Sequence, residues 1–329
     1  MDSLAKWPSE FAFPNFEDLP IVQGQPQGCL WGFFDKDGKK DELGTLNLLT
    51  SSVVREAAAE IRLGKSLQLD WSLKETSCPG YGRIPIEHTV KDLRSAGFVA
   101  FDEEIRINTQ TSSQWDGLRH WGLQESALFY NNVKHAEVAS TDVLGIHNIC
   151  ERGGIVGRGV LVDWVRWWQH AKPGIPVPAA NTTHSIPMSE IEEAARFQNT
   201  TFKQGDIFIV RTGYLACSAS QEDRKSNIQD EHRFIGIESS EATVRWLYSK
   251  HFAAVAGDAM GFEAWPYPKN CSLHEWLLAL WGTPIGELWD IEKLSQTCAD
   301  LGRWEFFLTS APLNLPGGIA SPPCAIAIF

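Results

Sequence analysis

Short apolar runs alternate with capped helical segments along most of this chain. The runs are rich in β-branched and aromatic residues, which favours strands; they cover 98–101, 159–163, 206–210, 252–256, 304–308 and 324–329. Serine residues that can cap a helix precede several segments between them; they are Ser51 or Ser52, Ser189 with Glu192, Ser239 or Ser240, and Ser272 with Glu275. This alternation predicts a mixed α/β fold.

The first 28 residues follow neither a helical nor a strand period. They mix Trp and Phe with four prolines, which predicts an extended arm that packs on its own domain or reaches across a dimer. No linker rich in Pro, Gly and Ser divides the remaining chain, and the 173–178 stretch is typical of a surface loop. We therefore expect an arm at 1–28 and one domain at 29–329.

Composition narrows the class of protein. With 43% hydrophobic and 21% charged residues in 329, the chain has the make-up of a globular protein. Its net charge of −12 argues against nucleic acid or an anionic membrane as partner, and no apolar run is long enough to span a bilayer. Charged residues near the N-terminus argue against a signal peptide, and seven scattered cysteines indicate buried, unpaired thiols. We expect a cytoplasmic protein with a small-molecule substrate.

Two segments carry candidate chemistry, although familiar nucleophile, phosphate and zinc motifs are absent. Asp116 and His120 lie four residues apart beside Gly117, a spacing that can direct both side chains at one ion. His274 opens a capped helix, and Glu287 follows a glycine-bearing segment. Imidazole and carboxylate from distant segments suit a catalytic metal site or an acid–base pair. The alternative is structural: a turn aspartate, satisfied core histidines and a solvated glutamate.

The order of several segments resembles the cyclase family of metal-dependent hydrolases, which includes kynurenine formamidases and isatin hydrolases, and within it the fungal-type branch. The family signature His-x-Gly-Thr-His-x-Asp-x-Pro-x-His falls on residues 110–120, where Asp116 and His120 are retained. Similar blocks follow at 157–163, 205–213, 253–258 and 312–318, with His274 and Glu287 where the family has a late metal-binding His and Glu. The resemblance implies a swivelling β/β/α barrel-like domain, a mixed sheet surrounded by helices.

Two departures from that signature change the expected metal site. Gln110 and Gln114 stand where the family has histidines, and an amide oxygen is a weaker ligand than imidazole. The resemblance then leaves one site for a single Mn²⁺ or Zn²⁺; its ligands are Asp116, His120, His274, Glu287 and Gln114. Alternatively the metal is lost, and His120, His274 and Glu287 act as acid–base groups.

The resemblance implies a hydrolase that cleaves an aryl formamide, cyclic amide or lactone carbonyl of a small aromatic or cyclic metabolite. Trp31, Trp115 and Trp121 are candidates for stacking on the substrate with Gln114 beside them, and His147 is a candidate for proton transfer. An alternative is a cyclase or dehydratase of secondary metabolism that uses acid–base catalysis, with or without metal. A third is a binding module that keeps only the fold. The family is usually oligomeric, so we expect a homodimer or larger assembly.

Overall fold

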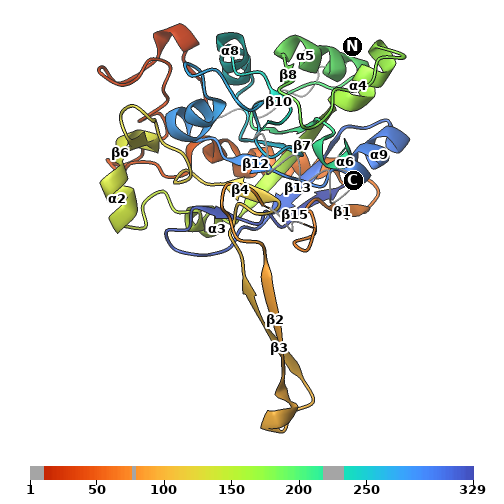
Figure 1. Ribbon diagram of the computed structural model, residues 1–329. Coiled ribbons are helices and arrows are strands. Elements are labelled where there is room, and N and C mark those ends of the chain that lie inside the picture. The colour runs from red at the N-terminus through yellow and green to blue at the C-terminus, as the bar shows by residue number, and fades with distance from the viewer. Residues whose placement is uncertain (1–10, 76–78, 218–232) are drawn as a thin grey trace.

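A mixed sheet of nine strands forms the centre of the molecule (Figure 1). The computed structural model describes residues 11–75, 79–217 and 233–329. In spatial order the strands are β1 (Ser66–Gln68), β15 (Ala325–Ile328), β13 (Glu305–Ser310), β7 (Ile155–Asp163), β9 (Ile207–Arg211), β11 (Ala254–Gly257), β12 (Ile285–Glu287), β4 (Gln114–Asp116) and β14 (Ala320–Ser321). The central run from β7 to β12 is parallel and both flanks are antiparallel.

Both faces of this sheet are covered, as the side chains of strand β9 show. Its side chains alternate, so Phe208 and Val210 enter one apolar core while Ile207 and Ile209 enter the other. A strand that is buried on both faces has a continuous apolar sequence, which is why β7 and β9 were predictable. The result is the expected single mixed α/β domain, a curled sheet surrounded by helices.

Helices and short strands complete the domain. The helices are α1 (Ser51–Ala57), α2 (His135–Ser140), α3 (His147–Glu151), α4 (Trp164–Ala171), α5 (Met188–Phe197), α6 (Tyr214–Cys217), α8 (Glu241–Lys250) and α9 (Glu292–Leu301), with a π-helical segment at Glu275–Trp281. Three two-stranded sheets pair β8 (Ser185–Ile186) with β10 (Gly236–Ile237), β5 (Leu128–Phe129) with β6 (Val133–Lys134), and β2 (Glu87–Asp92) with β3 (Phe101–Arg106). The β2–β3 hairpin projects far from the body (Figure 1).

Several predicted boundaries were wrong. The strand expected at 98–101 begins only at Phe101 and belongs to the exposed β2–β3 hairpin. The apolar residues of β3 are exposed to solvent, so their pattern did not mark a core strand. Helix α5 begins after Pro187 without a side-chain cap, so Ser189 lies inside the helix. Thr50 caps α1 instead of Ser51 or Ser52. Ser240 does cap α8, and the Ser272 hydroxyl accepts from the Glu275 amide as expected.

The described part of the N-terminal arm packs against its own domain. Phe11 and Phe13 contact Phe33 and Phe34, and the ring of Phe13 stacks on His251 with centroids 3.9 Å apart. Residues 1–10 lie outside the described part of the chain. Aromatic packing is therefore what holds residues 11–16 to the body.

Two expectations concern cysteines and membranes. Five cysteines have described side chains, and all five are free thiols: Cys29, Cys150, Cys271, Cys298 and Cys324. Cys324 is exposed, so the expectation that all thiols are buried was wrong; Cys78 lies outside the described residues, and the side chain of Cys217 is not described. Among the helices of residues 11–75, 79–217 and 233–329, none is both long and apolar enough to cross a bilayer.

Candidate metal centre

The pairing of β4 with β12 brings three candidate side chains to one face of the sheet. Gln114 lies directly opposite Glu287, and Asp116 is two residues further along the same strand. Because side chains alternate along a strand, Gln114, Asp116 and Glu287 face the same side. Chain segments about 170 residues apart thus meet through ladder hydrogen bonds, with all three side chains buried.

His274 enters this face from the start of the π-helical segment, held by a buried carboxylate. Glu263 accepts from the backbone amide of His274 at 3.1 Å and pairs with its Nδ1 at 2.6 Å. When Nδ1 carries the proton toward Glu263, Nε2 is left to face the site with its lone pair. A carboxylate behind a ligand histidine is the usual outer support of a metal site.

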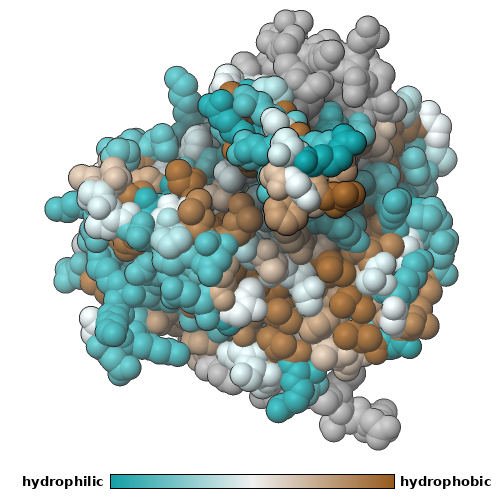
Figure 2. All heavy atoms as spheres, turned by 90° about the horizontal axis from the view of Figure 1, so that it is seen from below, coloured by the Kyte–Doolittle hydropathy of each residue, from teal (hydrophilic) through white to brown (hydrophobic). Residues whose placement is uncertain are grey.

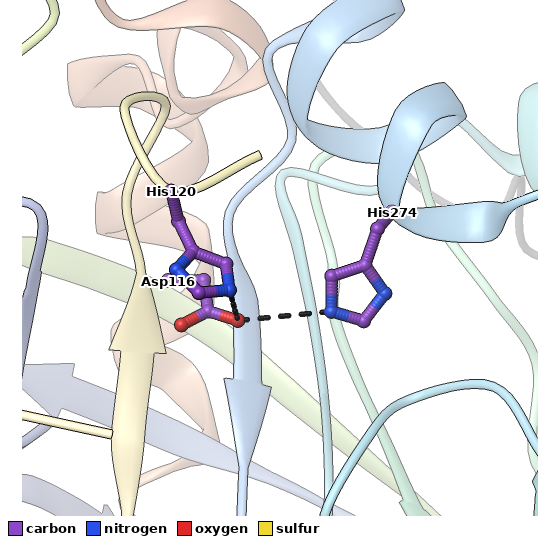
Figure 3. A group of neighbouring side chains, drawn as sticks. All are labelled: Asp116, His120 and His274. Atoms are coloured by element: carbon purple, nitrogen blue, oxygen red, sulfur yellow. Dashed lines mark ion pairs between the residues drawn. The ribbon is translucent and has the colours of Figure 1, made fainter. Parts of the chain in front are cut away.

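Asp116, His120 and His274 converge on one point (Figure 3). Asp116 Oδ2 lies 3.7 Å from His120 Nε2 and 3.8 Å from His274 Nε2. One ligand atom from each residue lies within 4.8 Å of the other two. Glu287 Oε1 is 3.2 Å from His274 Nε2, so the fourth predicted residue borders the same point. The structure therefore brings together all four acidic and imidazole residues expected from the sequence.

Two glutamine amides each donate a hydrogen bond to one carboxylate oxygen of Asp116 or Glu287. Gln110 Nε2 donates to Asp116 Oδ1, and Gln114 Nε2 donates to Glu287 Oε2 at 2.6 Å and to Gln110 Oε1 at 3.0 Å. Among the described residues, the other oxygens, Asp116 Oδ2, Glu287 Oε1 and Gln114 Oε1, are buried without a hydrogen bond of ordinary geometry, and the first two have only ion pairs to the imidazoles. Buried acceptors without partners are costly and rare. Their concentration here indicates that a ligand satisfies them.

The charges of the side chains around this point also favour a bound cation. Asp116, Glu263 and Glu287 are buried carboxylates that face two imidazoles. Burial opposes charge on His274, but Glu263 and Glu287 outweigh it and raise its pKa well above the usual value. Burial lowers the pKa of His120 despite Asp116, and burial with the Asp116 charge raises the pKa of Glu287. A cation at this point would offset the negative charge of the buried carboxylates.

These residues fit a divalent cation. Two imidazole nitrogens and an Asp116 oxygen, with buried oxygens of Glu287 and Gln114 beside them, form a mixed nitrogen and oxygen donor set, which suits a divalent metal ion. A cation would replace the proton on His274 Nε2 and neutralise the buried carboxylates. Gln110 and the amide nitrogen of Gln114 are engaged in hydrogen bonds, so of the two glutamines only Gln114 Oε1 is available as a ligand.

Of the other predicted site residues, Trp121 lies beside the cluster of Asp116, His120 and His274, and Trp115 lies away from it. The centroid of the Trp121 ring lies 5.6 Å from that of His274 and 6.1 Å from that of His120, and its buried Nε1 has no hydrogen-bond partner among the described residues. Trp115 faces the opposite side of β4, where it packs on Trp289 and donates to Ser310. Trp121 therefore borders the site, whereas Trp115 belongs to the core.

Trp31 and His147 also lie apart from the cluster. Trp31 is a core residue whose Nε1 donates to the Ala279 carbonyl. His147 Nδ1 accepts from the Gly317 amide, and in the described ranges no contact joins it to Asp116 or His274. The substrate and proton-transfer roles expected of Trp31, Trp115 and His147 have no support in this geometry.

Sequence reasoning missed Glu263 and Arg83. Arg83 donates to the Gln110 carbonyl at 3.1 Å and contacts Gln110 Oε1 at 3.5 Å, so it steadies the amide that holds Asp116. For Glu263 a signal existed: it is a lone carboxylate in an otherwise apolar stretch at 259–265, and such a residue is seldom buried unless paired. For Arg83 the sequence carries no comparable signal.

Residues 45–264 match a family model described as "Putative cyclase". This stretch is two thirds of the chain and contains Asp116, His120 and Glu263. The chain belongs to the cyclase family. His274 and Glu287 lie beyond the matched stretch and are joined to it by the contacts described above. A search of curated proteins returned no match.

Solved structures of similar proteins agree with this membership. One described as a novel cyclase is 30% identical, with a TM-score of 0.78 over 92% of this chain and 99% of the other. An isatin hydrolase A from Ralstonia solanacearum is 16% identical, with a TM-score of 0.57 over 83% and 94%. An isatin hydrolase bound to the product analogue thioisatinate is 14% identical, with a TM-score of 0.57 over the same shares. The two isatin hydrolases share the fold of this cyclase-family protein.

Proposed function

We propose that this cyclase-family protein is a metal-dependent hydrolase that cleaves an amide or lactone carbonyl of a small aromatic or cyclic metabolite. The observation that carries the proposal is the set of unpartnered oxygens on Asp116, Glu287 and Gln114 beside two imidazoles. When bound, a divalent ion at this point polarises a carbonyl and lowers the pKa of a water molecule.

Each side chain then has a separate task. Asp116, His120 and His274 would hold the ion, and Glu263 fixes the orientation of His274. Gln114 holds Glu287 Oε2, so Glu287 Oε1, which lies 3.2 Å from His274 Nε2, is the oxygen that would accept a proton. A carboxylate within reach of the attacking water is the group that general-base catalysis requires.

Trp121 supports an aromatic or cyclic substrate. Its ring flanks both histidines, so a planar substrate at the ion would lie against it. Its unpartnered Nε1 is an available donor for a substrate oxygen. The isatin hydrolases that share the fold add weight, since isatin hydrolase denotes action on a cyclic aromatic compound.

The test is turnover of aryl formamides, cyclic amides and lactones before and after removal of metal. We expect hydrolysis of at least one class, loss of activity on chelation, and recovery with Mn²⁺ or Zn²⁺. Asp116→Asn should lose both bound metal and turnover. Full activity in chelated protein would contradict the proposal.

A second candidate, a cyclase or dehydratase of secondary metabolism, is favoured by Gln110 and Gln114. Amides in place of imidazoles reduce the number of strong ligands and leave hydrogen-bond donors beside the carboxylates. In this case His120, His274 and Glu287 would move protons directly. Product formation without incorporation of water, in protein freed of metal, would favour this candidate over hydrolysis.

A further inference from the structure

The loop that precedes β2 carries an arginine to the edge of the candidate metal centre. Arg83 lies four residues before β2, and Gln110 lies four residues after β3. The Gln110 side chain contacts Arg83 through Oε1 and donates to Asp116 through Nε2, so a single amide separates the guanidinium from this candidate ligand. Burial lowers the pKa of His120, and the charge of Arg83 is among the groups that add to this lowering. Arg83 therefore borders the site.

The backbone of this loop is bent into an unusual conformation. Gly80, Tyr81 and Gly82 have φ angles of 70°, 50° and 70°, all in the left-handed region. A tyrosine rarely adopts that region, and residues held in it are concentrated at functional sites. The Arg83 amide closes the turn by donating to the Gly80 carbonyl at 2.9 Å. A Cβ atom on Gly82 would meet no described atom within 4 Å, so the space beside the loop is open there.

The guanidinium of Arg83 has donors to spare. Nη1 donates to the Gln110 carbonyl at 3.1 Å, and Nη2 reaches Gln110 Oε1 only at 3.5 Å, although a guanidinium has five N–H donors. No carboxylate within residues 11–75, 79–217 and 233–329 forms an ion pair with Arg83, whereas Arg158 is paired with Asp206. Arg83 is half-buried, and an arginine removed from water is usually paired. The unused donors suit a carboxylate supplied by a ligand.

Aromatic rings lie beside this arginine. Arg83 Cζ is 5.1 Å from the centroid of the Tyr81 ring, which packs edge-on against Trp265 with centroids 6.5 Å apart. Trp265 follows by two residues Glu263, the carboxylate that supports the site. The Tyr81 side is accessible, since 45% of this residue is exposed. Figure 2, seen from the hairpin side, shows hydrophilic side chains next to apolar ones on this face. A ligand that matches these surroundings combines a ring with an anionic group.

We propose that Arg83 selects the substrate by binding a carboxylate that the aromatic or cyclic molecule carries in addition to the carbonyl that is cleaved. This inference rests on the proposed function. With the carbonyl at Asp116 and the ring against Trp121, the carboxylate extends to the edge of the site, where Arg83 lies. The buried carboxylates and the net charge of −12 repel an anion. Arg83 provides the positive charge that offsets this repulsion and so admits an acidic substrate.

Benzoate and benzamide test the inference, because they share a shape and differ in charge. Titration calorimetry measures the affinity of the protein for each probe, with and without saturating Mn²⁺. We expect the native protein to bind benzoate at least about tenfold more tightly than benzamide, since hydrogen bonds between charged groups are strong. Arg83→Gln should remove this preference and leave the benzamide affinity unchanged. Arg83→Lys, which keeps the charge without the planar fork, should retain part of it.

Arg62→Gln is the matched control. It removes the same charge from an exposed arginine just before β1, at the end of the sheet far from β4. This variant should bind both probes as the native protein does. Circular dichroism checks that each variant is folded.

The ratio of the two affinities separates recognition from a structural role. If Arg83 only steadies Gln110, Arg83→Gln changes both affinities by the same factor and the preference survives, which overturns the inference. A preference that survives Arg83→Gln and disappears without Mn²⁺ assigns the carboxylate to the ion and overturns it too, as does a native protein without preference. Failure of the proposed function is seen separately, as an Arg83-dependent preference in a protein that hydrolyses none of the amides or lactones.

Discussion

At the scale of single residues, the pairing of Glu263 with His274 fixes the orientation of the His274 ring in the site. Glu263 is buried, and its only described ring partner is the Nδ1 of His274, 2.6 Å away. Burial raises and His274 lowers the pKa of Glu263, and the histidine prevails. The carboxylate thus stays charged and keeps Nε2 of His274 directed at Asp116.

Glu263→Gln tests this positioning role. An amide can still accept from Nδ1 but loses the charge, so affinity for Mn²⁺ should fall about 10–100-fold, the range for loss of a supporting carboxylate. Titration calorimetry with Mn²⁺ measures the affinity. Glu275→Gln is the matched control, because Glu275 faces the Gln124 amide instead. If the two variants bound Mn²⁺ with equal affinity, Glu263 would have no role in positioning the metal ligand His274.

Trp115 and Trp121 allow core and site roles to be separated. Trp115 is fully buried, so Trp115→Ala should reduce the free energy of unfolding by about 3–5 kcal/mol, as measured by urea denaturation. Trp121→Ala, at a partly exposed residue beside the histidines, should cost less stability and instead raise KM for the substrate. The reverse pattern of effects would show that Trp115, and not Trp121, faces the substrate.

At the scale of elements, the arm and helix α8 are joined through a half-buried histidine, His251. His251 ends α8 in a left-handed conformation with φ 50°, and its ring stacks on Phe13. Burial lowers the pKa of His251 to about 4. The unfolded chain takes up a proton below about pH 6.5, while the folded chain does not. Stability contributed by the neutral ring is therefore present above that pH and is lost as the pH falls toward 4.

His251→Asn isolates this pH dependence. Asparagine tolerates the left-handed conformation and does not titrate. The variant should be less stable than the native protein at pH 7.5, and the difference in Tm should shrink at pH 5. Thermal denaturation at both pH values measures it. A difference in Tm that stays constant between them would show that His251 does not titrate on unfolding in this range.

At the scale of the whole molecule, the elements that the sequence predicts best are the strands buried on both faces. Strands β7 and β9 are apolar throughout because both sheet faces are covered, so their positions were readable. Asp116 and His120 were found because they are close in the chain. His274 and Glu287 were candidates from their residue types, but only the family resemblance joined them to Asp116 and His120 in one site, since the β4–β12 pairing that brings Glu287 to Gln114 joins distant segments.

The rest was hidden for physical reasons. Trp115 and Asp116 are neighbours in sequence, but strand alternation turns them to opposite faces. The β2–β3 hairpin has no residue in the core, so no burial pattern marked it, and its strand was placed too early at 98–101. Glu263 supports the site from behind, where no spacing rule connects it to His274.

The central claim is that the unpartnered oxygens and the two imidazoles hold one divalent ion. Elemental analysis of protein loaded with Mn²⁺ or Zn²⁺ and then desalted tests it most directly, with Asp116→Asn and His274→Ala measured alongside. The account predicts one ion per native chain and its loss in both variants. A native protein that retains no metal, or variants that retain as much as the native chain, would contradict it.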